Sequence, residues 1–172
     1  GGYSGNGTIT GIVDFDAGSV CTNTGILTMG SAALNFGVTM DGTLHCGSGT
    51  VTLLDSNGVG LGTLTTLNGA SLVCAQPLTV NFGKTIEGTG FVQTPLLTVN
   101  GAIKPADLPS QPPLRGTLNV SGAVSLGVNN TYFCDIDPGI EFATADRIQS
   151  SGPATLNGAL TVAFIDGYVP QA

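Results

Sequence analysis

Charged residues are scarce in this chain: they make up 9% of its 172 residues, and only four of them are Lys or Arg. The four cations stand singly, at Lys84, Lys104, Arg115 and Arg147, so no basic stripe is available to neutralise a run of phosphates. The formal net charge is −7. We therefore expect no nucleic-acid partner. A negative, lysine-poor surface favours solubility outside a cell, and we predict an extracellular or cell-surface location.

Helix formers and long apolar runs are also missing. Tryptophan is absent, Glu is nearly so, and no extended window places apolar side chains at helical spacing. No run of apolar residues is long enough to predict a membrane span. The low charge, combined with 41% hydrophobic residues, argues against disorder. These absences leave an all-β protein as the predicted class.

Glycine, by contrast, is abundant. Its 27 residues close short segments in which apolar and polar side chains alternate, which is the pattern of a half-buried β-strand. Three such segments, 96–101, 116–122 and 158–164, are similar enough to be interpreted as copies of one unit. Glycines such as Gly69 and Gly90 are expected at the corners between strands.

The alternating segments recur at a regular interval. Residues 25–31 and 49–56 match in pattern with an offset of 24, and Cys21, Cys46 and Cys74 are spaced by 25 and 28 residues. Self-similarity over roughly 20–30 residues is typical of a solenoid whose repeats stack. We predict one domain, residues 1–172, folded as a parallel β-helix with about 23–28 residues per rung. An antiparallel β-sandwich, which also has many short strands, is the alternative.

Stacked parallel strands lie about 4.8 Å apart, so inward positions of successive rungs should form ladders of apolar side chains. The residues expected on such ladders are Leu27, Leu53, Val99, Val120 and Val162.

The second half of the chain carries an ordered set of motifs: Gly116–Gly122, Tyr132–Asp137, the turn Ala145–Ile148, Gly152–Val162 and the exit Gly167–Pro170. This order resembles the final rungs of bacterial autotransporter passenger domains and of related secreted β-strand-repeat surface proteins. The resemblance implies a right-handed parallel β-helix displayed outside the cell, and it names no ligand. Because the resembling proteins continue into further strands, we expect this chain to be a segment of something longer.

One segment departs from the repeat. Four prolines fall within residues 104–113. Proline lacks the backbone N–H that a central strand needs, so we predict a loop over 104–115 that separates rung blocks 1–103 and 116–172. We interpret this loop as a linker, with a docking loop on one face as the alternative.

Four cysteines, Cys21, Cys46, Cys74 and Cys134, refine the setting. Cys46 lies two places after a leucine, and so does Cys74, which puts both on the inward face of a strand. Cysteines on neighbouring rungs could come within disulfide range, and Cys21 with Cys46 is the first pairing we expect. The alternative is that all four are buried thiols.

No arrangement of residues indicates catalysis or metal binding. Asp14 with Asp16, and Asp135 with Asp137, bracket single apolar residues, so each pair projects from one face of a strand. Such a pair could hold calcium or serve glycosidase-like chemistry, but the solvated side of an amphipathic strand is the preferred interpretation. The single histidine, His45, has no partners at zinc-ligand spacing. We predict no enzyme activity, no cofactor and no metal.

Two ligand-binding functions are weaker alternatives, and a polysaccharide-acting β-helix enzyme is a third. Thr-x-Thr segments at residues 8–10, 50–52 and 63–65 would give a hydroxyl array like that of solenoid ice-binding proteins, but the copies are irregular. A glycan-binding surface is disfavoured because the chain has no Trp and only three tyrosines, Tyr3, Tyr132 and Tyr168, that could stack on sugars.

The predicted function is therefore structural or adhesive. The end rungs of a solenoid expose unpaired strand edges, which must be capped or joined to another copy. We expect self-association into a surface fibre, or contact with neighbouring segments of a longer chain, with a host or matrix surface as a further partner. The residues expected at these assembly edges are Thr8, Ile9, Thr10, Leu160, Val162 and Phe164.

Overall fold

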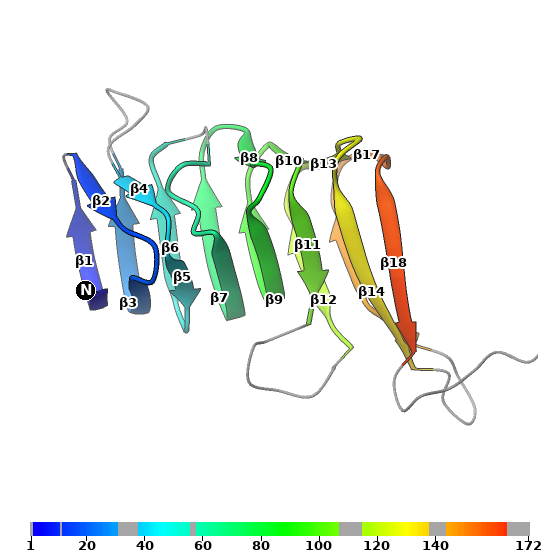
Figure 1. The fold of residues 1–172 in the computed structure, drawn as a ribbon, viewed down its shortest axis with the longest axis horizontal. Helices are drawn as coiled ribbons and strands as arrows, with labels where there is room; N and C mark the ends of the chain where they lie inside the picture. Colours follow the sequence, from blue (N-terminus) through cyan, green and yellow to red (C-terminus); the bar gives the residue numbers. More distant parts are fainter. Residues whose placement is uncertain are drawn as a thin grey trace, which may run out of the picture.

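The computed structural model describes residues 2–10, 12–30, 38–55, 58–106, 115–137 and 144–164. These residues form strands and turns, and none of them belongs to a helix that could cross a membrane. The strands lie side by side along the long axis of the molecule, from β1 at one end to β18 at the other (Figure 1).

The described strands group into three sheets. The largest has twelve strands: β1 (Gly2–Ile9), β3 (Val20–Met29), β5 (Thr43–Cys46), β6 (Thr50–Leu53), β7 (Leu64–Cys74), β9 (Thr85–Gln93), β11 (Ala102–Pro105), β12 (Thr117–Val120), β14 (Thr131–Asp137), β15 (Thr144–Ala145), β16 (Arg147–Ser150) and β18 (Ala159–Phe164). The second has four: β8 (Leu78–Val80), β10 (Leu96–Val99), β13 (Ala123–Leu126) and β17 (Ala154–Thr155). The third pairs β2 (Val13–Phe15) with β4 (Val38–Met40).

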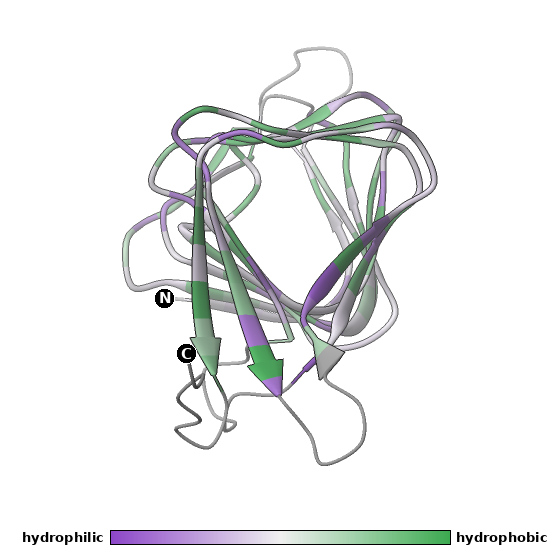
Figure 2. Ribbon diagram, turned by 90° about the vertical axis from the view of Figure 1, so that its right-hand side faces the viewer, coloured by the Kyte–Doolittle hydropathy of each residue, from purple (hydrophilic) through white to green (hydrophobic). Residues whose placement is uncertain are grey.

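Pairing is parallel throughout the described sheets except between β14 and β15. Seen along the long axis, strands of successive passes of the chain overlie one another (Figure 2). The all-β class and its parallel pairing are confirmed. The alternative of an antiparallel sandwich is wrong, because a sandwich of that kind pairs its strands in opposite directions, and among the described pairs only β14 with β15 does so.

The spacing of paired residues is less uniform than predicted. Thr85 of β9 lies beside Ala102 of β11, which is a much shorter step along the chain than the one from Thr117 of β12 to its neighbour Arg147 of β16. The first step falls below the predicted rung length and the second exceeds it, so the predicted range is too narrow.

The three segments interpreted as copies of one unit do not stack on one another. Residues 96–99 form β10 in the four-stranded sheet, whereas β12 and β18 belong to the twelve-stranded sheet. The neighbour of Leu96 is Ala123 of β13. The same alternating pattern thus serves strands on different faces, because it encodes one buried side and one exposed side wherever it occurs.

Part of the predicted proline-rich loop is strand. Lys104 and Pro105 extend β11 and pair with Glu87 and Gly88 of β9. The backbone N–H groups of Ala102 and Ala106 both donate toward β9, so the missing N–H of Pro105 faces the other neighbour, β14. Pairing with β14 accordingly ends at Ile103. Residues 107–114 lie outside the described residues.

Buried side chains alternate with exposed ones along most strands and form one continuous core. Leu27, Leu53, Val99 and Val120 are fully or almost fully buried, as predicted. Val162 was also expected in the core but is 42% exposed, because no described strand covers the far side of β18.

Gly69 and Gly90 lie inside strands rather than at corners between them. The pairing register of β7 with β9 shifts between Asn68 and Ser71, and both glycines have positive φ there, at 73° and 152°. A Cβ on Gly90 would lie 2.4 Å from the carbonyl oxygen of Ala70. The two strands therefore bend at glycine and continue.

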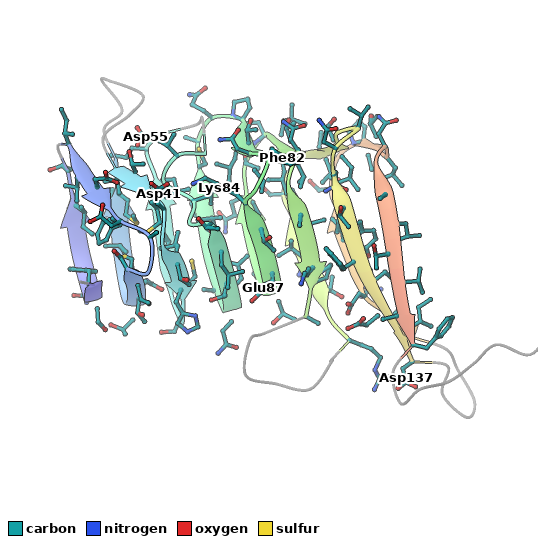
Figure 3. The ribbon with its side chains drawn as sticks, viewed as in Figure 1. Asp41, Asp55, Phe82, Lys84, Glu87 and Asp137 are labelled. Atoms are coloured by element: carbon teal, nitrogen blue, oxygen red, sulfur yellow. The ribbon has the colours of Figure 1, made fainter. Side chains whose placement is uncertain are left out.

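A half-buried lysine links its own segment to two earlier segments of the chain, one at Met40 and one at Val59–Leu61. The Nζ of Lys84 donates to the carbonyl oxygens of Met40 at 3.1 Å and Val59 at 3.5 Å, and it also donates to that of Leu61. Figure 3 shows Lys84 beside Asp41. Burial lowers the pKa of Lys84, and the nearby Asp41 carboxylate opposes that shift.

Candidate functional site

The feature that stands out in the described structure is the end of the sheet stack formed by the last strands. One inward ladder of paired residues crosses the whole molecule and ends there. Its members are Tyr3, Cys21, Leu44, Thr65, Ile86, Ile103, Tyr132 and Leu160. From Cys21 to Ile103 they are fully buried, Tyr132 is half-buried, and Leu160 is 63% exposed. The core is thus uncovered at this end.

The uncovered core forms two adjoining hollows of about 240 and 330 Å³. They share Leu126, Tyr132 and Leu156 as lining residues, and Leu156 is 71% exposed. Ile148 and Val124 extend the first hollow, and Leu160 extends the second. Figure 2 looks onto this end, where hydrophobic residues alternate with polar ones on the nearest strands. We call this surface the open end.

Three strand edges are exposed together at the open end. Among the described residues β16 pairs only with β12, β17 only with β13, and β18 only with β14. Each has hydrogen-bonded neighbours on one side alone. A parallel edge of this kind presents backbone N–H and C=O groups at regular spacing, and another strand can form hydrogen bonds with them.

Asp146 joins the last strands together beneath the open end. Its carboxylate accepts hydrogen bonds from the backbone N–H of Gly116 at 2.8 Å and of Asp135 at 3.1 Å. Its carbonyl oxygen accepts from the hydroxyl of Tyr132 at 2.9 Å and from the thiol of Cys134. The pKa of Tyr132 is raised, mainly by burial, so this phenol remains a donor at neutral pH.

The opposite end is built on β1, which pairs only with β3 among the described residues. Its inward positions hold Tyr3, Gly5 and Ile9, all half-buried. The hydroxyl of Tyr3 donates to the carbonyl oxygen of Asn6 at 2.6 Å, which holds the ring over the end of the core. Two glycines, Gly5 and Gly7, therefore separate the large inward residues Tyr3 and Ile9 along β1.

The predicted edge residues divide between these two ends. Thr8 and Ile9 belong to β1, and Thr10 follows its last residue. Leu160, Val162 and Phe164 belong to β18. That assembly occurs through them stays a prediction.

The acidic pairs occupy different surroundings. Asp14 lies in β2 and Asp16 directly follows it, and both are exposed, as expected of a solvated strand face. Asp135 is buried, whereas Asp137 forms an ion pair with Arg115 at 3.0 Å. No group of three or more His, Cys, Asp or Glu side chains in the described part is close enough to hold a metal ion.

The single histidine lies within the sheet. His45 of β5 is half-buried, and its Nδ1 is hydrogen-bonded to the hydroxyl of Thr66 on the neighbouring strand β7. This contact gives the ring a structural partner.

All four cysteines are free thiols in the structure. Cys21 pairs with Leu44, and Cys46 lies beside Asn23, two positions further along. At a strand separation of about 4.8 Å and a rise of about 3.3 Å per residue, that offset places the two Cα atoms about 8 Å apart, beyond the usual disulfide range. The Cys21–Cys46 bridge that we expected first is not formed.

Cys46 should make stability fall in alkaline solution. Burial, reinforced by Cys21, raises the pKa of its thiol from 9.0 to about 12. The unfolded chain therefore loses this proton first, and the stabilisation, complete below about pH 9, is lost as the pH rises toward 12 at about 1.4 kcal/mol per unit. Urea unfolding at pH 9, 10 and 11 measures the slope. Cys46→Ala should flatten it by one proton's worth, and an unchanged slope would contradict the assignment.

The threonine array is short. Thr8, Thr28 and Thr52 face outward in register, but Val73 follows them on the next strand. Thr65, expected in the same kind of array, is buried. A regular hydroxyl lattice therefore does not extend along the molecule.

Sequence reasoning missed the residues that shape the open end most. Leu156 lies in a segment of small and polar residues, and Ile148 follows an arginine, so neither suggests a core position on its own. The signal that could have found them is alignment with the buried positions of preceding strands: Ile148 pairs with the buried Leu118.

Comparison of the chain with protein-family models, with curated proteins and with solved structures finds no significant match.

Proposed function

We propose that this chain is a right-handed parallel β-helix that serves as a non-catalytic structural unit of an extracellular or cell-surface assembly, joined to the next unit through its open end. The observation that carries the proposal is the loss of burial along a single ladder, from fully buried Ile103 to Leu160 at 63% exposure. An exposed apolar layer bordered by unpaired strand edges is a surface on which a further layer of strands can stack.

The two ends of the chain are complementary in strand direction and in register. Because the ladder that contains Tyr3 and Leu160 begins in β1 and ends in β18, a second copy stacked in the same way would place its Gly2 beside Ala159, its Tyr3 beside Leu160 and its Gly5 beside Val162. The tyrosine ring would cover an exposed leucine, and the glycine would leave room for a valine. Each copy then supplies what the other lacks.

The handedness follows from the parallel connections, which are right-handed in nearly all known sheets. The resemblance of residues 116–170 to passenger-domain rungs supports display outside the cell. A segment of a longer passenger would use the same end, covered by its own next rung in place of a second copy.

Electron microscopy of the purified chain over a concentration series tests this function. We expect rods that lengthen with concentration, because addition at the open end is a bimolecular step. Single short rods at every concentration, up to millimolar, would refute assembly of this chain with itself.

A further inference from the structure

A second surface lies on one side of the stack, next to the open end, with which it shares β16 and Ser150. Outward residues of β9, β12 and β16 line a groove of about 270 Å³. In register across these strands are Phe91, Asn119 and Gln149. Gln93, Ser121 and Ser151 line its next row. We call this surface the amide groove.

The amide groove combines one exposed ring with uncharged hydrogen-bonding groups. Phe91 is 50% exposed, although most large apolar side chains of the twelve-stranded sheet are buried. The side-chain amide of Asn119 donates to the carbonyl oxygen of Gly90 at 3.3 Å, which fixes its orientation. Within the described residues, the carboxamides of Gln93 and Gln149 have no hydrogen-bond partner and are exposed. Both can donate and accept.

Charge decides the kind of ligand. None of the residues that line the groove is charged, and the chain as a whole carries −7. The nearest cation on β16, Arg147, donates its Nε–H to the hydroxyl of Thr117 at 2.9 Å. An anionic ligand would be repelled by the protein and would find no cation directed into the groove.

We propose that the amide groove binds a short stretch of neutral carbohydrate. A pyranose ring presents an apolar face of C–H groups, which suits Phe91, and a rim of hydroxyls, which suit amides that both donate and accept. An apolar floor with a few polar groups is the usual composition of a small-ligand site. The groove lies within one copy of the chain, so the proposal does not depend on assembly.

Titration calorimetry with neutral tri- and tetrasaccharides of glucose, galactose and mannose tests the site. Oligogalacturonate serves as the acidic comparison. The Leu160→Asp chain is the protein to use, so that loss of assembly cannot be mistaken for loss of binding. At least one neutral oligosaccharide should bind with a millimolar or lower Kd.

Two variants locate the binding. Phe91→Ala should weaken it about tenfold through the lost ring contact, and Gln149→Ala about fivefold through lost hydrogen bonds. Phe82→Ala is the matched control, since Phe82 is 80% exposed and lies outside the groove. Circular dichroism checks that each variant is folded. No binding of any neutral sugar, preference for oligogalacturonate, or equal loss in Phe82→Ala would overturn the proposal.

Discussion

Replacing Leu160 with aspartate is expected to stop the chain from assembling and to leave the single molecule folded. Leu160 is 63% exposed in one copy, so the change costs the isolated fold little. In the proposed joint it would be covered by Tyr3 of the next copy. Burying an unpaired carboxylate there costs several kcal/mol, and the concentration needed for assembly should rise at least about 100-fold.

Analytical ultracentrifugation gives the size distribution, and thermal unfolding at low concentration gives the stability of the single copy. Phe82→Asp is the matched control, because Phe82 is 80% exposed and lies away from both ends (Figure 3). It should assemble as the parent does. If Leu160→Asp and the parent assembled at the same concentration, the open end would not be the joint.

The register of the joint can be measured separately. Thr161 and Ser4 are exposed, and each lies next to the proposed Leu160–Tyr3 contact. A chain carrying Ser4→Cys and Thr161→Cys should form cross-links between copies on mild oxidation. Pairing Ser4→Cys with Val128→Cys should not, because Val128 lies in the turn before β14 and is not on the edge. Equal cross-linking in both chains would contradict the register.

Replacing Lys84 with methionine is expected to give the largest loss of stability among single changes of a charged residue. Methionine keeps the length of the side chain but leaves the carbonyl oxygens of Met40 and Leu61 without the ammonium that now donates to them, whereas that of Val59 still accepts from the backbone N–H of Met40 at 3.0 Å. An orphaned buried acceptor costs about 1–3 kcal/mol. Because Lys84 is half-buried, water can satisfy part of this loss, and we expect about 2–4 kcal/mol, or a Tm lower by roughly 5–15 °C.

Lys104→Met is the matched control for this change. The Nζ of Lys104 lies 4.5 Å from the centroid of the Phe133 ring and bridges no turns of the chain. Its loss should cost less than about 1 kcal/mol. Lys84→Arg, which retains donors, should restore part of the stability. Differential scanning calorimetry on the three variants measures these losses of stability. Equal losses for Lys84→Met and Lys104→Met would mean that charge alone, rather than the carbonyl contacts, stabilises the fold.

The strands and their inward sides could be predicted from sequence because they depend on local alternation. Leu44 and Cys46 were placed on one face by their spacing, and both are fully buried. The repeat that relates 25–31 to 49–56 appears unchanged in the pairing of Ile26 with Thr50. A period of two residues and an apolar pattern are enough for these predictions.

Lys84 and Asp146 show where local patterns stop being informative. Each stands near turn residues, where a charged side chain is usually solvated. Lys84 is held by carbonyl oxygens from residues 23 to 44 positions earlier, and Asp146 accepts from Gly116, 30 positions earlier. Which carbonyl or N–H group lies within hydrogen-bond distance of either side chain depends on the length of every intervening turn, and that length varies along this chain.

The range of step lengths between paired strands bears on how the protein folds. The shortest step joins Thr85 to Ala102, the longest joins Thr117 to Arg147, and each new parallel strand closes a chain loop within these bounds. Loop-closure entropy grows only with the logarithm of length, and the longest of these closures costs about 0.5 kcal/mol more than the shortest. Each further parallel strand can therefore be paired at nearly constant entropic cost.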